Sequence, residues 1–441
     1  MLRNGAWTIV SAMVLVAGTT LANQRKRTPM PHKRRLFVPP ALILIAFPGL
    51  SGHAQDSKTG KSEANPPNIQ TTDYLVPHIS TVPANAGKRV ELFVREKVAS
   101  GRRGRRGAAP VVLMIGGATI SAVPDFDLQF ENYSWMDYLA AAGFDVFAMD
   151  LTGYGLSPRP MMDDPCNNST SDQQSYLIPK PLAQTCSPSY PFQLTSLESD
   201  GDEIDTVVDY LRQRRNVDKV SLVAWSKGGN RAGHYTAMHP DKVEKLFLYA
   251  PGRYQRLNPS DPPGPLPLPG VPTTVVSAAD LYKSTWDLNG GTSVPFTGMC
   301  DNQYTPPIRP VVTATQLEFD PLGSTWGTAG VRRSPIFPSG NMQTGWNAHF
   351  AGQITVPTLI IRGDLDTAVP LSDIEDLLGD LVAVPQKVFV HVACASHYLV
   401  WENQHMALLN ASVEWLQQGT YAGQFNGSFA VDTGGQVHQE R

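Results

Sequence analysis

The sequence predicts an α/β fold in which a mostly parallel central sheet is flanked by helices and carries a cap or lid insertion. Short runs such as Val111–Ile115 and Val220–Ala224 are wholly apolar, which is typical of central parallel strands covered on both faces. These runs alternate with segments of helical periodicity, the pattern of a parallel sheet wound with helices. Of the 441 residues 41% are hydrophobic and 17% are charged, enough for a large core and against a disordered chain.

Taken in chain order, each element has its own signal. Arg89–Arg95 alternates between apolar and polar residues, as a half-buried strand does. The helix expected over Tyr133–Ala142 is closed by Gly143, a residue type common at helix C-termini. Further strands are expected at Val111–Ile115, Phe144–Met149, Val220–Ala224, Val243–Tyr249, Val356–Ile361 and Lys387–Val392, and further helices at Leu197–Arg215, Lys227–Met238, Asp373–Leu381 and Asn403–Gln418.

Two stretches interrupt this alternation. Residues 157–195 are irregular, and residues 251–346 are rich in proline but contain large aromatic residues, among them Trp286, Phe296, Tyr304, Trp326 and Trp346. A long insertion with such residues is expected to fold as a cap or lid. We therefore expect a core at 88–250 and 347–418, a cap at 251–346, a flexible lead-in at 55–87 and a loose C-terminal tail at 419–441.

Residues 1–54 have the parts of an export signal. The basic stretch Met30–Arg35 precedes the apolar run Leu36–Leu50 and the small residues Ser51–Ala54. The run is short and interrupted by proline, so no stable membrane span is expected in the mature chain. A second apolar stretch, Ala6–Ala22, lies upstream; Met30 is favoured as the true start, and the alternative is an extra anchor. The expected location is periplasmic or secreted, and the oligomeric state stays open.

The charge balance argues against nucleic acid as a partner. Residues 1–54 hold seven Lys and Arg and no acidic residue, which leaves 29 basic and 39 acidic residues in the mature chain. A net charge of −10 repels polyanions. The one basic run, Gly101–Gly107, is interpreted as a solvated turn.

Four cysteines, Cys166, Cys186, Cys300 and Cys394, allow three disulfide pairings, and export makes disulfides possible. Cys166 and Cys186 share one insertion, so a local bridge between them is preferred. Cys300 would then pair with Cys394 and link the cap to a loop near the chain's end, unless both are buried thiols.

The segment Ala224–Gly229 follows a predicted strand and opens a predicted helix. This is the context of a nucleophile elbow, in which small residues, here Ala224 and Gly228, allow a sharp turn that exposes the serine hydroxyl, here Ser226. The alternative is that Ser226 caps its helix, since serine is a favoured N-cap.

With three further features the chain resembles the α/β-hydrolase superfamily over about residues 88–418. Met114–Ala118 ends an apolar strand, with Gly116 where most relatives have His. Asp150–Ser157 looks like the family's Asp-x-x-Gly-x-Gly-x-Ser loop. The late segments Gly363–Asp366 and Ala395–His397 follow in the family's order of nucleophile, acid and histidine.

The resemblance implies a triad of Ser226, Asp366 and His397. The histidine would take the serine proton, and the aspartate would fix its tautomer. Asp364 is the alternative acid, but the family's acid is the fourth residue of Gly-x-x-Asp, which favours Asp366. The remaining histidines that bear on this choice are expected to be structural or to lack the strand-end setting: His234, His239, His349, His391 and His405.

Two backbone N–H groups are expected to form an oxyanion hole. One belongs to Lys227, at the start of the helix, and the other to Gly117 or Ala118, with Ala118 favoured. The sequence thus predicts a serine hydrolase that cleaves a carboxylic ester through an acyl-enzyme, with no cofactor and no metal. The expected substrate is a small molecule with an apolar or aromatic group. Amide, lactone or carbon–carbon hydrolysis and perhydrolysis remain open, as does a non-catalytic binding protein on the same frame.

Overall fold

The computed structural model describes residues 68–100, 109–168, 171–252, 254, 256, 267–281, 300–336 and 346–440. The predicted export segment and the basic run Gly101–Gly107 lie outside the described residues, as do Trp286 and Phe296 of the predicted cap. Within the described ranges, no helix combines the length and the apolar character that a membrane crossing requires.

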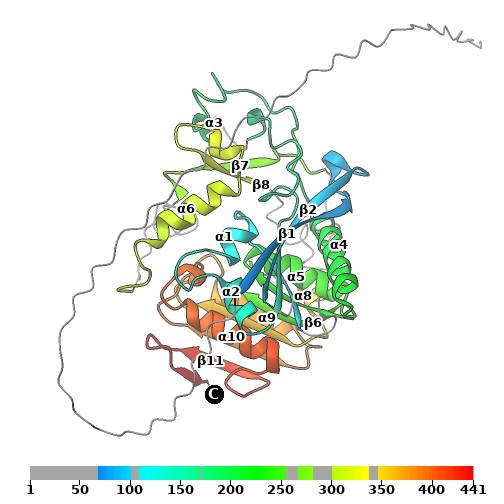
Figure 1. Ribbon diagram of the computed structural model, residues 1–441, viewed down its shortest axis with the longest axis vertical. Coiled ribbons are helices and arrows are strands. Elements are labelled where there is room, and N and C mark those ends of the chain that lie inside the picture. Colours follow the sequence, from blue (N-terminus) through cyan, green and yellow to red (C-terminus); the bar gives the residue numbers. More distant parts are fainter. Residues whose placement is uncertain are drawn as a thin grey trace, which may run out of the picture. The chain divides into compact units, whose positions relative to one another are not determined.

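A ten-stranded sheet forms the centre of the described chain (Figure 1). Its order is β1-β2-β4-β3-β5-β6-β9-β10-β11-β12. The strands from β4 to β11 pair in parallel, whereas β1, β2 and β12 are antiparallel to their neighbours. The predicted mostly parallel sheet is confirmed. The strands are β1 (Ile69–Ile79), β2 (Arg89–Ala99), β3 (Val111–Ile115), β4 (Asp145–Met149), β5 (Val220–Trp225), β6 (Val243–Tyr249), β9 (Thr358–Gly363), β10 (Lys387–Val392), β11 (Gly427–Val431) and β12 (Val437–Gln439).

Helices cover both faces of this sheet, because the inner strands are apolar on both sides. In β3, Val112 and Met114 belong to one buried cluster, which also contains side chains of α2 and α10. Leu113 and Ile115 belong to the other, with side chains of α4, α5 and α9. The helices are α1 (Ala122–Phe126), α2 (Trp135–Ala141), α4 (Leu197–Arg215), α5 (Lys227–Met238), α8 (Ala348–Ala351), α9 (Leu371–Asp380) and α10 (His405–Gln418).

Both ends of the described chain differ from the sequence-based expectation. The predicted lead-in at 55–87 is wrong for its described part, because β1 pairs with β2 along its whole length from Ile69 to Ile79. The predicted loose tail is also wrong, because β11 joins β10 in parallel and buries Phe429 and Val431. Both strands place polar residues among their buried ones, so neither has the wholly apolar signal of a central strand.

The cap contains a two-stranded antiparallel sheet, β7 (Thr273–Ser277) with β8 (Val331–Pro335), together with α6 (Ile308–Glu318). The irregular insertion at 157–195 belongs to this unit as well. It contributes α3 (Ser171–Ser175), and the isolated bridges Asn168 to Thr273 and Phe192 to Pro269 connect it to the β7 region. The cap therefore draws on two separate insertions rather than on residues 251–346 alone.

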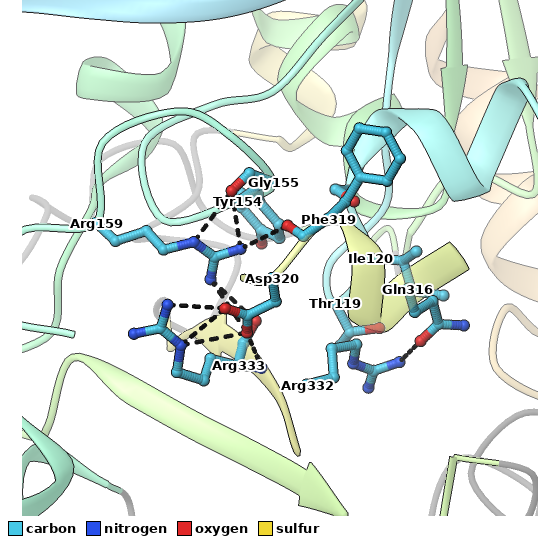
Figure 2. A pocket seen from close by; sticks show the side chains of 11 residues that line it. Thr119, Ile120, Tyr154, Gly155, Arg159, Gln316, Phe319, Asp320, Arg332 and Arg333 are labelled. Carbon is cyan, nitrogen blue, oxygen red and sulfur yellow. Dashed lines mark hydrogen bonds and ion pairs between the residues drawn. The ribbon is translucent and has the colours of Figure 1, made fainter. Parts of the chain in front are cut away.

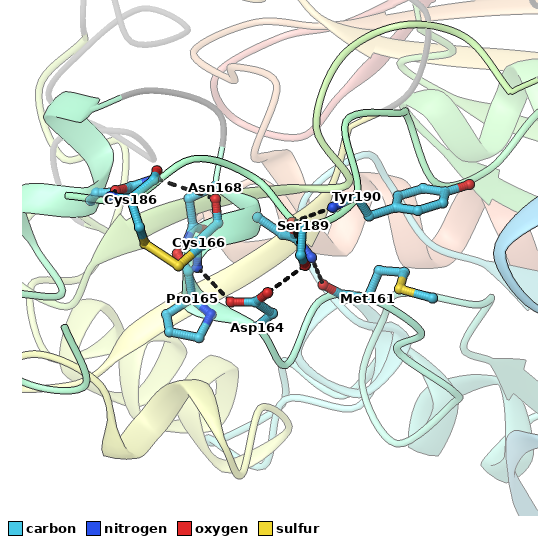
Figure 3. Close-up of a disulfide and its surroundings, with 10 residues drawn as sticks. Met161, Asp164, Pro165, Cys166, Asn168, Cys186, Ser189 and Tyr190 are labelled. Carbon is cyan, nitrogen blue, oxygen red and sulfur yellow. Dashed lines mark hydrogen bonds between the residues drawn. A yellow bond between two sulfur atoms is a disulfide. The ribbon is translucent and has the colours of Figure 1, made fainter.

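The preferred disulfide between Cys166 and Cys186 is present, with the Cα atoms 5.3 Å apart (Figure 3). The bridge closes the first insertion, and polar contacts reinforce it: Asp164 Oδ1 accepts from Cys166 N at 2.9 Å, and its other oxygen accepts from the hydroxyl of Ser189. The second expected bridge, Cys300 to Cys394, also forms, with Cα atoms 5.6 Å apart. It links the cap segment to the loop after β10.

Candidate active site

Ser226 lies at the turn between β5 and α5 in a conformation that few residues with a side chain adopt. Its φ is 52° and its ψ is −122°, which costs about 1–3 kcal/mol. The Ser226 N–H donates to Tyr249 O at 2.9 Å, and the Ser226 carbonyl accepts from Gly252 N at 2.6 Å. The Ser226 hydroxyl makes no capping bond to α5, so the helix-capping interpretation is wrong.

The sharp turn requires glycine at position 228. A Cβ atom on Gly228 would lie 2.3 Å from Ile115 O and 2.7 Å from Gly116 O. The first turn of α5 therefore rests directly on the end of β3. A Cβ atom on Gly117 would lie 3.5 Å from Ser226 Cβ, so the loop after β3 passes close over the serine.

His397 connects Ser226 to Asp366 by two hydrogen bonds. His397 Nε2 is 2.9 Å from Ser226 Oγ, and His397 Nδ1 is 2.9 Å from Asp366 Oδ2. The three residues follow β5, β9 and β10, and the carboxyl ends of parallel strands meet at one edge of a sheet. With its proton on Nδ1, the imidazole donates to the carboxylate and can accept from the serine hydroxyl.

The carboxylate of Asp366 is oriented by its own loop. Asp366 Oδ1 accepts from the N–H groups of Ala368 and Val369, both at 2.9 Å. The Asp366 side chain is fully buried, so its other oxygen has a fixed direction toward His397. Asp364, the alternative acid, instead accepts from His391 Nδ1 at 2.8 Å, away from Ser226.

The other histidines have different partners. His405 is buried and stacks on Tyr133, with ring centroids 4.0 Å apart. His234 packs edge-on against Phe350, and His239 lies beside Tyr235. His349 Nε2 lies 2.7 Å from the side-chain nitrogen of Gln353. None of these contacts involves Ser226.

The backbone of His397 is fixed from the sheet by two donors. Tyr249 Oη donates to His397 O at 2.6 Å, and Trp225 Nε1 donates to the same oxygen at 3.1 Å. Trp225 and Tyr249 stack on each other with centroids 5.4 Å apart. Sequence reasoning missed both roles, although Trp225 stands beside the predicted nucleophile.

Glu402 holds the histidine loop from the other side. Its carboxylate accepts from Ser396 N at 2.7 Å, from the Ser396 hydroxyl at 2.5 Å and from Gln303 Nε2 at 2.9 Å. Burial raises the pKa of Glu402 to about 7. Gln303 lies three residues after Cys300, whose disulfide reaches Cys394 in the same loop. The cap segment and the His397 loop are therefore joined by a covalent bond and by a buried polar contact.

The loop after β3 decides between the two predicted oxyanion donors. Gly117 N donates to Asp125 Oδ2 at 3.0 Å, so its N–H is already used and Gly117 is wrong as a donor. No described residue accepts from the Ala118 N–H. A Cβ atom on Gly116 would lie 2.7 Å from Asp125 Oδ2, so a larger residue here would have to displace that carboxylate.

The buried Arg231 holds the loop after β3 by hydrogen bonds. Arg231 Nη1 donates to Gly117 O at 3.2 Å, and Arg231 Nε donates to Asp200 Oδ2 at 2.7 Å. Tyr154 Oη donates to Ala118 O at 2.5 Å. Burial, together with the nearby Arg231 cation, lowers the pKa of Lys227 to about 8. The main chain around the candidate nucleophile thus rests on a buried polar network.

Comparison with known proteins identifies the type of fold. A family model described as alpha/beta hydrolase fold matches residues 109–273, a range that contains the loop after β3 and Ser226 but ends before Asp366 and His397. The chain therefore has the α/β-hydrolase fold. The mostly parallel sheet and the order of Ser226, Asp366 and His397 agree with this assignment.

Individual relatives of this α/β-hydrolase are distant or matched over a short stretch. The poly(3-hydroxyalkanoate) polymerase subunit PhaC of Allochromatium vinosum is 51% identical over 43 residues, 10% of this chain and only 12% of that protein. A meta-cleavage product hydrolase from Pseudomonas fluorescens is 17% identical with a TM-score of 0.45, over 79% of this chain and 98% of that one. The esterase Est1E of Butyrivibrio proteoclasticus is 16% identical with a TM-score of 0.40, over 74% and 93% of the two chains. No substrate follows from similarities this low.

Proposed function

We propose that this α/β-hydrolase cleaves a carboxylic ester through an acyl-enzyme on Ser226. The observation that carries the proposal is the continuous chain of two 2.9 Å hydrogen bonds from Ser226 Oγ through His397 to Asp366. A serine hydroxyl becomes an effective nucleophile when a positioned base takes its proton as it attacks.

The reaction has two halves. Ser226 Oγ attacks the ester carbonyl while His397 Nε2 takes its proton, and Asp366 stabilises the resulting imidazolium. His397 then protonates the leaving alcohol, which departs and leaves the acyl group on Ser226. A water molecule, deprotonated by His397, attacks the acyl-enzyme and releases the acid and the free serine.

The N–H groups of Ala118 and Lys227 are the proposed oxyanion donors. Ala118 follows Gly117 in the loop over Ser226, and Lys227 is the first residue of α5, where helix N–H groups face outward. Both are backbone donors, so side-chain substitution at either position leaves the hydrogen bonds available.

An apolar or aromatic substrate is part of the proposal. Tyr398, which directly follows His397, stacks on Trp401 with centroids 5.7 Å apart and meets Trp225 edge-on. Trp225 and Trp401 are buried, so the half-buried Tyr398 supplies the aromatic surface beside His397, and aromatic surface is typical of small-molecule sites. We also infer export to the periplasm or the medium, which suits the two disulfides because such bonds persist in oxidising compartments.

The test is labelling by a fluorophosphonate probe, followed by a panel of ester, lactone and amide substrates. Wild type should react with the probe and hydrolyse esters fastest, and Ser226→Ala should do neither. Ser412→Ala is a matched control, because its buried hydroxyl bonds Leu409 O and Trp135 instead. Absence of labelling in wild type would favour a binding protein, and faster lactone or amide cleavage would change the reaction class. Nitrophenyl esters of increasing length test the apolar pocket, and a sharp preference for acetate contradicts it.

A further inference from the structure

A buried cluster of positive charge lies between the cap and the loop over Ser226. Three arginines and one aspartate, Arg159, Arg332, Arg333 and Asp320, line a small cavity together with Thr119 and Tyr154 (Figure 2). The cavity is adjacent to the proposed oxyanion loop, since Thr119 follows Ala118 and Tyr154 Oη donates to Ala118 O. Positive charge is therefore in excess beside the site proposed for ester cleavage.

Two of the arginines share the aspartate. Arg333 Nη2 donates to Asp320 Oδ1 at 2.7 Å, and Arg333 Nη1 also reaches Asp163 at 2.7 Å. Arg159 Nη1 lies 3.6 Å from Asp320 Oδ2. Figure 2 shows both side chains converging on Asp320. These two arginines have the partners that a structural arginine needs.

Arg332 differs from its neighbour. Its side chain is 7% exposed, and no carboxylate of the described residues lies within ion-pair distance of it. Its Nη1 donates to Gln316 Oε1 at 2.8 Å, whereas its Nε is buried without an acceptor. Gln316 Nε2, on the same amide group, is also buried without an acceptor. Two donors are thus unsatisfied side by side, which buried groups rarely are.

The direction of Arg332 follows from the alternation of side chains along β8. Arg333 faces the cap, whereas Ser334 donates to Thr119 O at 2.7 Å; Arg332 lies on the same face of the strand as Ser334. The positive charge of Arg332 also acts on residues of two loops at the site, since it lowers the pKa of Asp125 and of Tyr398, although burial keeps both pKa values above their ordinary range. The guanidinium therefore lies within electrostatic range of the oxyanion loop and of the His397 loop.

No group within the described residues neutralises Arg332. Asp320 is engaged by Arg333 and Arg159, and burial raises the pKa of Asp125 well above its usual range, which favours its neutral form. An unpaired charge in the protein interior is costly and is retained where a ligand supplies the counter-charge. The cavity offers about 10 Å³ of accessible space, room for one water-sized polar group, and a planar guanidinium matches a carboxylate.

We propose that Arg332 and Gln316 bind a carboxylate carried by the substrate. This inference rests on the proposed function, because it makes the substrate an ester with an apolar part near Tyr398 and an acidic group under the cap. Arg332 and Gln316 are then specificity residues, and the cap selects the substrate by charge.

The experiment compares 4-nitrophenyl half-esters of succinic, glutaric and adipic acid with neutral 4-nitrophenyl esters of matched length, on wild type, Arg332→Met and Gln316→Leu. Acetoxybenzoates and acetoxytoluenes place the same contrast on the leaving group. Wild type should prefer one anionic ester, and Arg332→Met should lower kcat/KM for that ester about 10- to 100-fold, the value of a lost charged hydrogen bond. Its effect on the neutral ester should stay within about threefold.

A binding measurement separates this inference from the proposed function. In the Ser226→Ala background, free glutarate or adipate should raise Tm, and addition of Arg332→Met should abolish the rise. Without ligand, Arg332→Met should keep or raise Tm because it removes an unpaired buried charge, whereas Arg333→Met should lower it. Equal losses on neutral and anionic esters, or no Tm response to any diacid, would mean that the cavity holds water only and overturn the inference. Hydrolysis of neutral esters alone would leave the proposed function intact.

Discussion

Replacement of Asp366 by asparagine exchanges one carboxylate oxygen for an NH₂ group and so tests the role of Asp366 as the acid of the triad. Asp366→Asn has nearly the same shape and leaves a choice of two amide orientations. In the first, the amide oxygen keeps the two bonds from Ala368 N and Val369 N, both 2.9 Å. The amide NH₂ then faces His397 Nδ1, which must be unprotonated, so the imidazole proton lies on Nε2 and points at Ser226.

The second orientation restores the histidine tautomer but turns the NH₂ group toward two backbone N–H groups. It leaves two buried N–H donors facing another donor, at about 1–3 kcal/mol each, so it lies about 2–6 kcal/mol higher. The productive tautomer is therefore populated at about 10⁻¹ to 10⁻⁴. We expect kcat to fall about 10³- to 10⁴-fold, with the lost stabilisation of the imidazolium included, while KM changes little.

Steady-state hydrolysis of a 4-nitrophenyl ester and the rate of fluorophosphonate labelling measure the effect. Asp364→Asn is the matched control: its exposed carboxylate contacts His391, and a surface contact of this kind should change kcat by no more than about twofold. If Asp364→Asn is as damaging as Asp366→Asn, or if Asp366→Asn keeps a tenth of the activity, the assignment of the acid is refuted.

For three further changes to the protein, the structure predicts the direction of the effect on stability or activity. Gly228→Ala should give an unstable or poorly active protein, since its Cβ would lie 2.3 Å from Ile115 O; activity and a melting curve close to wild type would contradict the packing of β3 on α5. Glu402→Gln sets an amide NH₂ against other donors, so we expect about 1–3 kcal/mol of destabilisation and a lower kcat at unchanged KM. Burial raises the pKa of Glu402 from 4.5 to about 7, so the folded protein holds a proton that the unfolded chain releases; stability should fall as pH rises through this window, a slope that urea titrations of Glu402→Gln should lack. Deletion of residues 424–441 should make the protein aggregate, because it removes the buried Phe429 and exposes β10; a soluble, active deletion would show that β11 is dispensable.

The central sheet could be predicted from the sequence because its signals are local. Val111–Ile115 and Lys387–Val392 have the predicted bounds, as does the helix Leu197–Arg215. A strand buried on both faces is a short apolar run, and a helix with a capped start and a polar outer face has a clear period, so neither requires knowledge of its neighbours. Ser226 was predictable for the same reason, since the small residues that permit its strained φ stand within a few positions of it.

Contacts between distant segments were decided only by the tertiary structure. The sequence left Asp364 and Asp366 as alternatives, and the direction of each carboxylate separated them, one toward His391 and the other toward His397. Gly117 was excluded as an oxyanion donor because its N–H donates to the carboxylate of Asp125. No sequence motif indicates this contact. The strands β1 and β11 were missed because their mixed polar and apolar residues give a weak local signal, and their stability comes from the strands they pair with.

The sequence by itself therefore determined the fold class, the elbow and the order of the three triad residues, because each depends on the spacing of a few neighbouring side chains. The tertiary structure decided which buried charged side chains have a partner of opposite charge among the described residues and which have none. Glu402 reaches Ser396 and Gln303, and Arg332 is buried without a carboxylate while Arg333 beside it has two. The physical reason is that burial sets the energy of a charge, and burial depends on how the whole chain packs.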